Sequence, residues 1–167
     1  MMDAMINETA AQAVSYGTLQ LNEIRDLPGL EVMRRVADGR FPSAPISKLM
    51  NFHLVEADDG IAIFEGTPGP EMLNPLGSVH GGWALTLVDS ATGCAAHTTL
   101  EAGIGYTTVE TKMNFARPIS PETGLVRCEG RVISRGRKII TADAMLRDRN
   151  GKLLAHGTST LIVLGPV

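Results

Sequence analysis

The chain has 167 residues, of which 44% are hydrophobic and 20% charged, and its net charge is −3 at pH 7. This length and composition predict one globular domain with a single hydrophobic core. The slightly acidic balance argues against general nucleic-acid binding, and no run of about 18 apolar residues is present to cross a membrane. The first eight residues lack the features of a secretory signal, so we expect a cytoplasmic protein.

Residues 1–44 are predicted to form an N-terminal helical arm, and residues 45–167 the main domain. Within the arm, Leu30, Met33 and Val36 recur at helical spacing. A glycine three residues later is the expected end of this helix. A further short helical turn is expected just after the proposed boundary, over residues 46–50.

The main domain is predicted to open with a hairpin over residues 51–67, in which Asp58-Asp59-Gly60 is the turn. One helix of about five turns should then run from Val79 to Thr98. It is rich in glycine, alanine and serine, which permit close backbone approach, so we expect a sheet to wrap around it. Trp83 near its start is expected to be a core or interface residue.

Four strands are predicted after this helix, over residues 106–115, 125–134, 139–147 and 152–164. In the first of them, Val109, Met113 and Phe115 should share one face, and Thr108, Glu110 and Asn114 the other. Two strands, a long helix and four more strands predict an α+β fold, with an antiparallel sheet against the helix. The back of the helix needs cover, which a second copy of the domain could supply.

Two cysteines, Cys94 and Cys128, provide no disulfide framework, and both are expected to be reduced core residues. His53, His97 and His156 are scattered along the chain without the spacing of metal ligands. We therefore expect neither a catalytic thiol nor a metal site.

An unusual stretch from Asn74 to Gly82, Asn-Pro-Leu-Gly-Ser-Val-His-Gly-Gly, opens the long helix, and Asp89 lies seven residues beyond it. A glycine costs a helix about 1 kcal/mol relative to alanine. In return it leaves backbone N–H groups bare, with room for a ligand against them. Asp89 is also unusual, because it places a charged carboxylate among the small and apolar residues of this helix. The two features predict a site where backbone amides polarise a carbonyl and a carboxylate acts on it.

The order of the elements and the His80-Gly81-Gly82 motif resemble the hotdog fold, specifically the PaaI-type acyl-CoA thioesterases. The resemblance runs from about Pro45 to Leu164, and it includes Asn74, Gly77, Asp89, the strand from Thr107 to Phe115, and Arg117-Pro118. It implies an antiparallel sheet of about six strands around one central helix. It also implies hydrolysis of acyl-CoA thioesters by dimers or tetramers, without a metal and with coenzyme A only as part of the substrate.

The resemblance further implies a role for each matching residue. Asn74 would orient the thioester and the nucleophile or water, and the N–H of Gly81 would bind the developing oxyanion. His80 would support that loop, and Asp89 would act as nucleophile or general base. Thr108 matches a hydroxyl position that some relatives use to hold the attacking water.

Spacing along the helix adds an inference of its own. Gly81 and Asp89 are eight residues apart, which is about 12 Å at 1.5 Å per residue. An oxyanion donor must lie about 3 Å from the carbonyl oxygen, and an attacking group about 3–3.5 Å from the carbonyl carbon. One substrate cannot span both within one helix. If both residues act, they should come from different protomers of a dimer.

A cluster of basic residues lies on and beside the turn between the predicted strands 125–134 and 139–147: Arg127, Arg131, Arg135, Arg137 and Lys138, with Glu129 as the opposing charge. Arg127, Arg131 and Arg135 are separated by even numbers of residues, so they should lie on the same face of the strand. The cluster is either a solvated hairpin or a platform for the phosphates of CoA, which bind arginine and lysine well. The resemblance favours the second interpretation, with Gly136, Arg137 and Lys138 as contacts. Arg117, Gly82 and Thr107 are further candidates for substrate binding.

Simpler interpretations stay open at this point. Asp89 could hydrogen-bond a neighbouring backbone, His80 could be satisfied within its loop, and Gly81-Gly82 could be a close-packing point. Two other functions are also possible on this fold: an acyl-CoA-binding module without turnover, and a hydratase. The first would not need Asp89. Some hydratases of this fold use an Asp where this chain has Asn74, which cannot serve as a base.

The acyl group is expected to be an aryl or medium-chain aliphatic group. Its pocket could be lined by apolar side chains from several elements: Met72, Leu73, Trp83, Met113 and Phe115.

Overall fold

The computed structural model describes residues 14–166, so residues 1–13 of the predicted arm lie outside the described residues. Three helices precede the first strand: α1 (Leu21–Ile24), α2 (Gly29–Ala37) and α3 (Pro45–Leu49). The remaining elements are β1 (Phe52–Asp58), β2 (Ile61–Gly66), the 3-10 turn η1 (Pro70–Met72), α4 (Gly81–Thr98), β3 (Ile104–Phe115), η2 (Pro121–Thr123), β4 (Val126–Arg135), β5 (Ile139–Asp148) and β6 (Leu153–Pro166).

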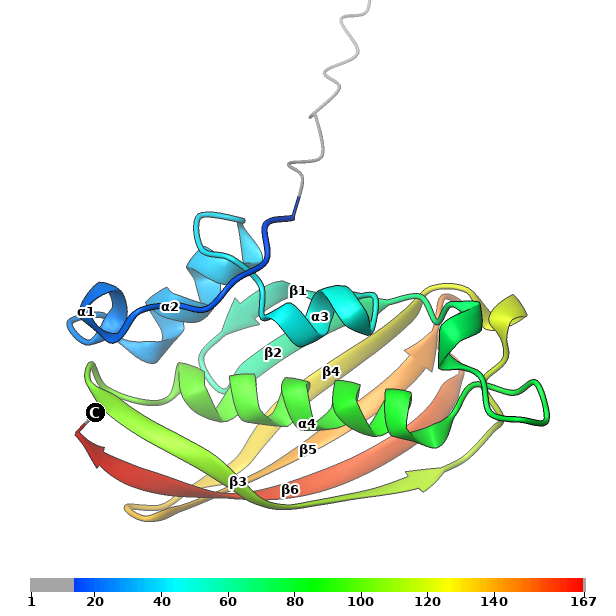
Figure 1. Cartoon of the computed structure of the whole chain (residues 1–167). Helices are drawn as coiled ribbons and strands as arrows, with labels where there is room; N and C mark the ends of the chain where they lie inside the picture. The colour runs from blue at the N-terminus through cyan, green and yellow to red at the C-terminus, as the bar shows by residue number, and fades with distance from the viewer. Residues whose placement is uncertain (1–13, 167) are drawn as a thin grey trace, which may run out of the picture.

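The six strands form one antiparallel sheet in the order β1-β2-β4-β5-β6-β3. The sheet curves around α4, and α1 to α3 lie on the other side of that helix (Figure 1). This confirms the predicted fold, an antiparallel sheet of six strands around one long helix. The predicted elements are present within a few residues of their expected ends, while α1 and the two 3-10 turns were not predicted.

Close backbone contact joins α4 to the sheet. Leu87, Val88 and Ala91 of α4 are completely buried. A Cβ on Gly130 of β4 would collide with the carbonyl of Ala91, and a Cβ on Gly157 of β6 would lie 2.8 Å from Val88 Cγ1. Two strand glycines therefore let the helix approach the sheet more closely than any side chain would permit.

The predicted alternation of β3 is wrong, because the strand contains a β-bulge. Its pairing with β6 shifts register between Thr108 and Glu110. A bulge adds one residue, so the residues on either side of it change faces. Val109, expected beside Met113 on one apolar face, is instead 62% exposed. Even-numbered residues face α4 before the bulge, and odd-numbered residues face it afterwards.

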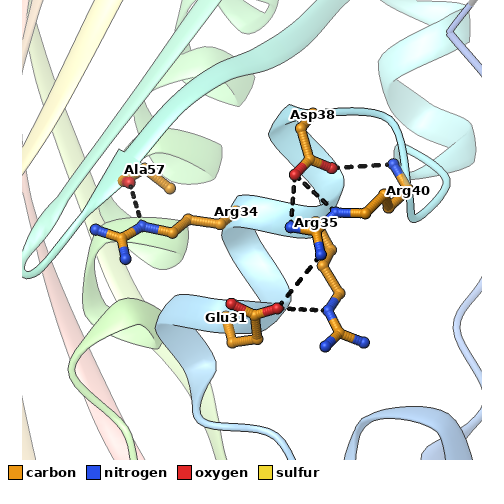
Figure 2. A network of polar contacts seen from close by, with 6 residues as sticks. All are labelled: Glu31, Arg34, Arg35, Asp38, Arg40 and Ala57. Carbon is orange, nitrogen blue, oxygen red and sulfur yellow. Dashed lines mark hydrogen bonds and ion pairs between the residues drawn. The ribbon is translucent and has the colours of Figure 1, made fainter.

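The amino-terminal segment, defined here as residues 14–51, is attached to both α4 and the sheet. The amide of Gly29 donates to the carbonyl of Leu100 at 3.0 Å, just beyond α4. Arg34 reaches from α2 to β1, where its Nη2 lies 2.9 Å from Asp58 Oδ1. Its Nε donates to the carbonyl of Ala57 at 3.4 Å (Figure 2). Other charged side chains pair along α2 and just beyond its end: Glu31 with Arg35 and Arg40, and Asp38 with Arg40 (Figure 2). The division at residues 44/45 stays a prediction.

Candidate active site

The first turn of α4 presents an unbonded backbone amide. His80 is the N-cap residue, and its Nδ1 accepts the N–H of Gly82 at 2.9 Å. This cap explains why the helix begins at Gly81, two residues later than predicted. Among residues 14–166, no acceptor bonds the N–H of Gly81. The amide is therefore free for a ligand at the positive end of the helix dipole.

A cavity of about 380 Å³ lies at this end of α4, lined by Gly81, His80, Phe115 and Arg117 among others. A Cβ on Gly81 would lie 2.7 Å from the Phe115 ring, so glycine lets that ring cover the helix start. Arg117 is exposed, and its Nη1 donates to the carbonyl of Leu153 at 2.7 Å. The guanidinium is thereby held beside the cavity.

The side chain of Asn74 is occupied within its own loop. Its Oδ1 accepts the N–H of Leu76 at 2.9 Å and that of Ser78 at 3.3 Å, while Nδ2 donates to Ser78 Oγ at 2.9 Å. Asn74 lines neither this cavity nor the one beside Asp89. It closes the turn that leads into His80, and its orienting role stays a prediction.

Asp89, two turns further along α4, is held by a chain of hydroxyl groups. Thr111 Oγ1 of β3 donates to Asp89 Oδ1 at 2.9 Å. Behind it, Ser159 Oγ lies 3.0 Å from Thr111 Oγ1 and 2.7 Å from Thr92 Oγ1. Thr92 Oγ1 also lies 2.9 Å from the carbonyl oxygen of Val88. One oxygen of the carboxylate is fixed by this chain, and no protein donor bonds the other oxygen among residues 14–166.

Thr111 was missed by sequence reasoning for a specific reason. Strict alternation in β3 placed Thr111 on the same face as Val109, away from Thr108. The β-bulge between Thr108 and Glu110 brings both threonines to the side of α4. No sequence signal marks this bulge, because neither a glycine nor a proline stands there.

Asp89 also lines a second, larger cavity of about 450 Å³. Thr108 lies in the same lining, whereas Thr107 is exposed on the opposite side of β3. Cys94 lines it too, and burial raises the pKa of its thiol to about 12. A thiol with that pKa stays protonated at neutral pH and is a poor nucleophile. Both Cys94 and the buried Cys128 are free, as expected.

The structure thus distributes the candidate residues between two cavities of one chain. Gly81, His80 and Arg117 surround the first, and Asp89 and Thr108 belong to the second.

The basic cluster is only partly available for a ligand. Arg127 pairs with Glu56 and Glu65, and Arg131 pairs with Glu129. The expected common face of the three arginines is interrupted, because β4 shifts register between Val132 and Ser134, before Arg135. Arg127 and Arg131 are therefore engaged in surface salt bridges.

The turn from Gly136 to Lys138, between β4 and β5, is exposed and carries Arg137 and Lys138 outside any salt bridge of the described chain. The carbonyl of Lys138 accepts the N–H of Val163 at 2.8 Å, and Val163 lies opposite Tyr106 of β3. Tyr106 lines the cavity beside Asp89. The turn therefore lies at the same end of the sheet as Tyr106. This is the end at which α4 finishes, far from the start of α4 (Figure 1).

Trp83 is a core residue, as predicted: it is buried, and its Nε1 donates to the carbonyl of Met50 at 2.7 Å. Met72 is buried as well, and of the five expected acyl-pocket residues only Phe115 lines either cavity. In the described part of the chain, no group of three His, Cys, Asp or Glu residues could hold a metal ion. No helix within residues 14–166 combines the length and hydropathy needed to cross a membrane.

Comparison with known proteins places these features in a family. Residues 76–155, which include Gly81, Asp89 and Thr111, match the Thioesterase superfamily model. The solved structure of the conserved protein PA5202 from Pseudomonas aeruginosa is 30% identical, with 72% of this chain and 94% of that one covered and a TM-score of 0.67. The chain belongs to the thioesterase superfamily. It is a thioester hydrolase with a hotdog fold.

Two further structures are similar to this thioesterase. One is the Escherichia coli PaaI protein from the phenylacetic acid degradation operon, with 20% identity, a TM-score of 0.72, and coverage of 83% of this chain and 97% of that one. The other is smu.793 from Streptococcus mutans, solved with acetyl-CoA bound, with 26% identity, a TM-score of 0.63, and coverage of 70% and 90%. The first supports the fold that the PaaI-like resemblance implied.

Proposed function

We propose that this thioesterase hydrolyses acyl-CoA thioesters to a free acid and CoA. The observation that carries the proposal is the unbonded N–H of Gly81 at the start of α4. When a thioester carbonyl is attacked, its oxygen gains negative charge, which an N–H at a helix N-terminus stabilises. Loss of one such donor typically costs an enzyme about 10²–10³ in rate.

Asp89 supplies the carboxylate of this reaction, as nucleophile or as general base. Thr111 binds Oδ1, which leaves Oδ2 to attack the carbonyl carbon or to take a proton from a water that attacks it. The carbon–sulfur bond then breaks, and CoA leaves as a thiolate. If water attacks, this step releases the free acid; if Asp89 attacks, water then hydrolyses the mixed anhydride, which releases the acid and restores the carboxylate. Because a thiolate is a good leaving group, one carboxylate is sufficient and the chemistry needs no cofactor beyond the CoA of the substrate. Thr108 holds the attacking water.

Two protomers complete each site in this proposal. The cavities at Gly81 and Asp89 are separate in one chain, and the two residues are about 12 Å apart along the helix. β3 is an edge strand that pairs only with β6, and it carries the exposed side chains of Val109 and Phe115. An unpaired strand edge with apolar side chains favours pairing with another chain. A two-fold dimer through this edge brings Gly81 of one protomer toward Asp89 of the other, with Asn74 and His80 supporting the loop at Gly81.

CoA binds across the same interface. Gly136, Arg137 and Lys138 form the turn that is level with the Asp89 cavity, and their charges suit the CoA phosphates. Arg117, from the cavity at Gly81, adds a third cation. Gly82 and Thr107 line neither cavity of the described chain, so their roles as substrate contacts stay predictions from the sequence.

Asp89→Asn tests the proposal, because it preserves shape and removes the charge. Thiol release from a panel of acyl-CoAs should lose most of its kcat, to below about a tenth of wild type, while substrate binding is retained. Asp59→Asn, the same change in the exposed β1–β2 turn, should leave turnover unchanged. Retention of more than about a tenth of kcat by Asp89→Asn would exclude Asp89 as the reacting carboxylate. Binding without thiol release by the wild type would identify an acyl-CoA-binding module instead.

A further inference from the structure

The cavity beside Asp89 is enclosed largely by the amino-terminal segment. More than half of its lining residues precede β1. They come from the stretch around Gly17–Leu19, from α2, and from the chain leading into α3. The other walls are α4 with Asp89, the β1–β2 hairpin and the first half of β3. The amino-terminal segment thus forms the wall of the cavity that faces the proposed reacting carboxylate.

The lining of this cavity combines large apolar side chains with neutral hydroxyl groups and one charge. Among residues 14–166, Asp89 is the only charged side chain in the lining. The large apolar side chains of the lining are Leu19, Met33, Val36, Ile46, Leu54 and Phe64. Burial of apolar surface is favourable by about 25 cal/mol per Å², whereas an unpaired charge is costly to bury. The cavity therefore suits a hydrocarbon group and does not suit a nucleotide or phosphate.

The wall is held in place without a ligand. Val32 of α2 is 2% exposed and belongs to the main core, and Gly29 is bonded to the end of α4 as described above. At the other end of the segment, Trp83 Nε1 donates to the carbonyl of Met50 and fixes the chain just after α3. Between them, the amide of Gly17 donates to the carbonyl of Ser43 at 3.0 Å. A wall fixed at several points can discriminate between ligands by size.

We propose that this cavity receives the acyl group of the thioester, and that Met33, Val36 and Ile46 of the amino-terminal segment set the largest acyl group accepted. The ligand class is a CoA thioester whose acyl group is apolar beyond its carbonyl and larger than acetyl. The proposal rests on the proposed function, because it places the acyl carbonyl at Asp89. From there the hydrocarbon extends toward α2 and α3, where these three side chains lie.

Ile46 is the best position for a test. It lies on the short helix α3 and lines the cavity. Because Ile46 is 46% exposed, a larger side chain at this position should not prevent the chain from folding. Leu49 lies on the same helix, is 72% exposed and does not line the cavity. Ile46→Trp and Leu49→Trp therefore form a matched pair that adds the same group inside and outside the cavity.

The experiment compares kcat/KM for octanoyl-CoA, phenylacetyl-CoA and acetyl-CoA by thiol release. Ile46→Trp should lower the values for octanoyl-CoA, phenylacetyl-CoA or both by about tenfold or more, since small changes of pocket volume typically alter kcat/KM by 10–200-fold. The value for acetyl-CoA should stay within about threefold of wild type, and Leu49→Trp should match wild type throughout. Loss for only one of the large substrates would identify the acyl shape. Ile46→Ala should raise the ratio of kcat/KM for the two large substrates to kcat/KM for acetyl-CoA.

This inference would be overturned if Ile46→Trp changed kcat/KM equally for all three substrates, or for none of them. The proposed function would still stand in that case, provided that Asp89→Asn is inactive. Should Ile46→Trp lower Tm more than Leu49→Trp does, the Ile46→Ala ratio decides the matter. If the wild type releases no thiol from any substrate, the proposed function fails. Titration calorimetry with octanoyl-CoA then tests whether the cavity binds the acyl group, independently of turnover. Equal affinity of the wild type and Ile46→Trp for octanoyl-CoA would overturn the inference.

Discussion

The carboxylate of Asp89 owes its orientation to Thr111. A helix residue with two rotatable side-chain bonds samples several rotamers unless a neighbour selects one. Thr111 does so by donating to Oδ1, and its own position is set by Ser159. Ser159 is almost completely buried, so this support is not exchanged with solvent. The hydroxyl chain is therefore a positioning device for the proposed reaction.

Thr111→Val should lower kcat by about tenfold or more with little change in KM, because misplacing a reacting group mainly affects the transition state. Thr111→Ser keeps the hydroxyl and should restore most of the activity. Thr158→Val, at an exposed position of β6, serves as the control for loss of a threonine in the sheet. Equal loss of kcat in the Val and Ser variants would show that any change of side chain at this position is harmful, and would remove the evidence for a specific role of the hydrogen bond.

Among the elements, α4 was the most predictable and β3 the least. The run of small and apolar residues after His80 indicated a long helix next to a sheet, and the glycine pair indicated a ligand site at its start. Both features depend on neighbours within a few residues. The bulge in β3 depends on its pairing with β6, which is distant in the sequence, so alternation wrongly placed Val109 on the same face as Met113.

The β4–β5 turn illustrates a similar limit. Its sequence indicated a basic patch with Glu129 as the opposing charge, and Glu129 of β4 does pair with Arg131. Only the structure shows that Arg127 is also paired, by Glu56 of β1 and Glu65 of β2. Arg137 and Lys138 in the turn itself are the exposed cations that could meet a phosphate.

Replacing both, in Arg137→Ala with Lys138→Ala, should raise KM for acyl-CoA more than it lowers kcat. Contacts to the CoA phosphates are made equally in the ground state and transition state, so their loss weakens binding uniformly. Thioesters of pantetheine lack the nucleotide and should be much less affected. Steady-state kinetics on both substrate types make the comparison, and equal losses on both would mean that the turn is structural.

At the scale of the whole molecule, the distance between Gly81 and Asp89 followed from helix geometry alone, because the rise of a helix fixes it whatever the rest of the chain does. The cavity beside Asp89 could not be predicted in this way. It is formed by segments on both sides of α4 whose contact depends on the complete fold, and four of the five residues expected to line an acyl pocket lie elsewhere.

A shared site should show complementation between two inactive variants. Asp89→Asn removes the carboxylate, and Asn74→Ala damages the loop that leads to Gly81 at the other end of the site. In a mixed dimer, one site contains both defects and the other contains neither. Equal mixing after reversible dissociation should restore about a quarter of wild-type activity, since half of the dimers are mixed and each has one intact site. Full subunit exchange without recovery would place both residues in one protomer's site.

The close contact of α4 with the sheet gives the two sides of this helix different freedom to change during evolution. At Gly130 and Gly157 the sheet touches helix backbone and the Val88 side chain, so almost any larger residue there would force the layers apart. The opposite side of α4 faces the amino-terminal segment across an open cavity, where side chains of different size can be accommodated. Substrate preference can therefore diverge in descendants of this chain through substitutions in α2 and α3, while the carboxylate and the sheet that supports it stay the same.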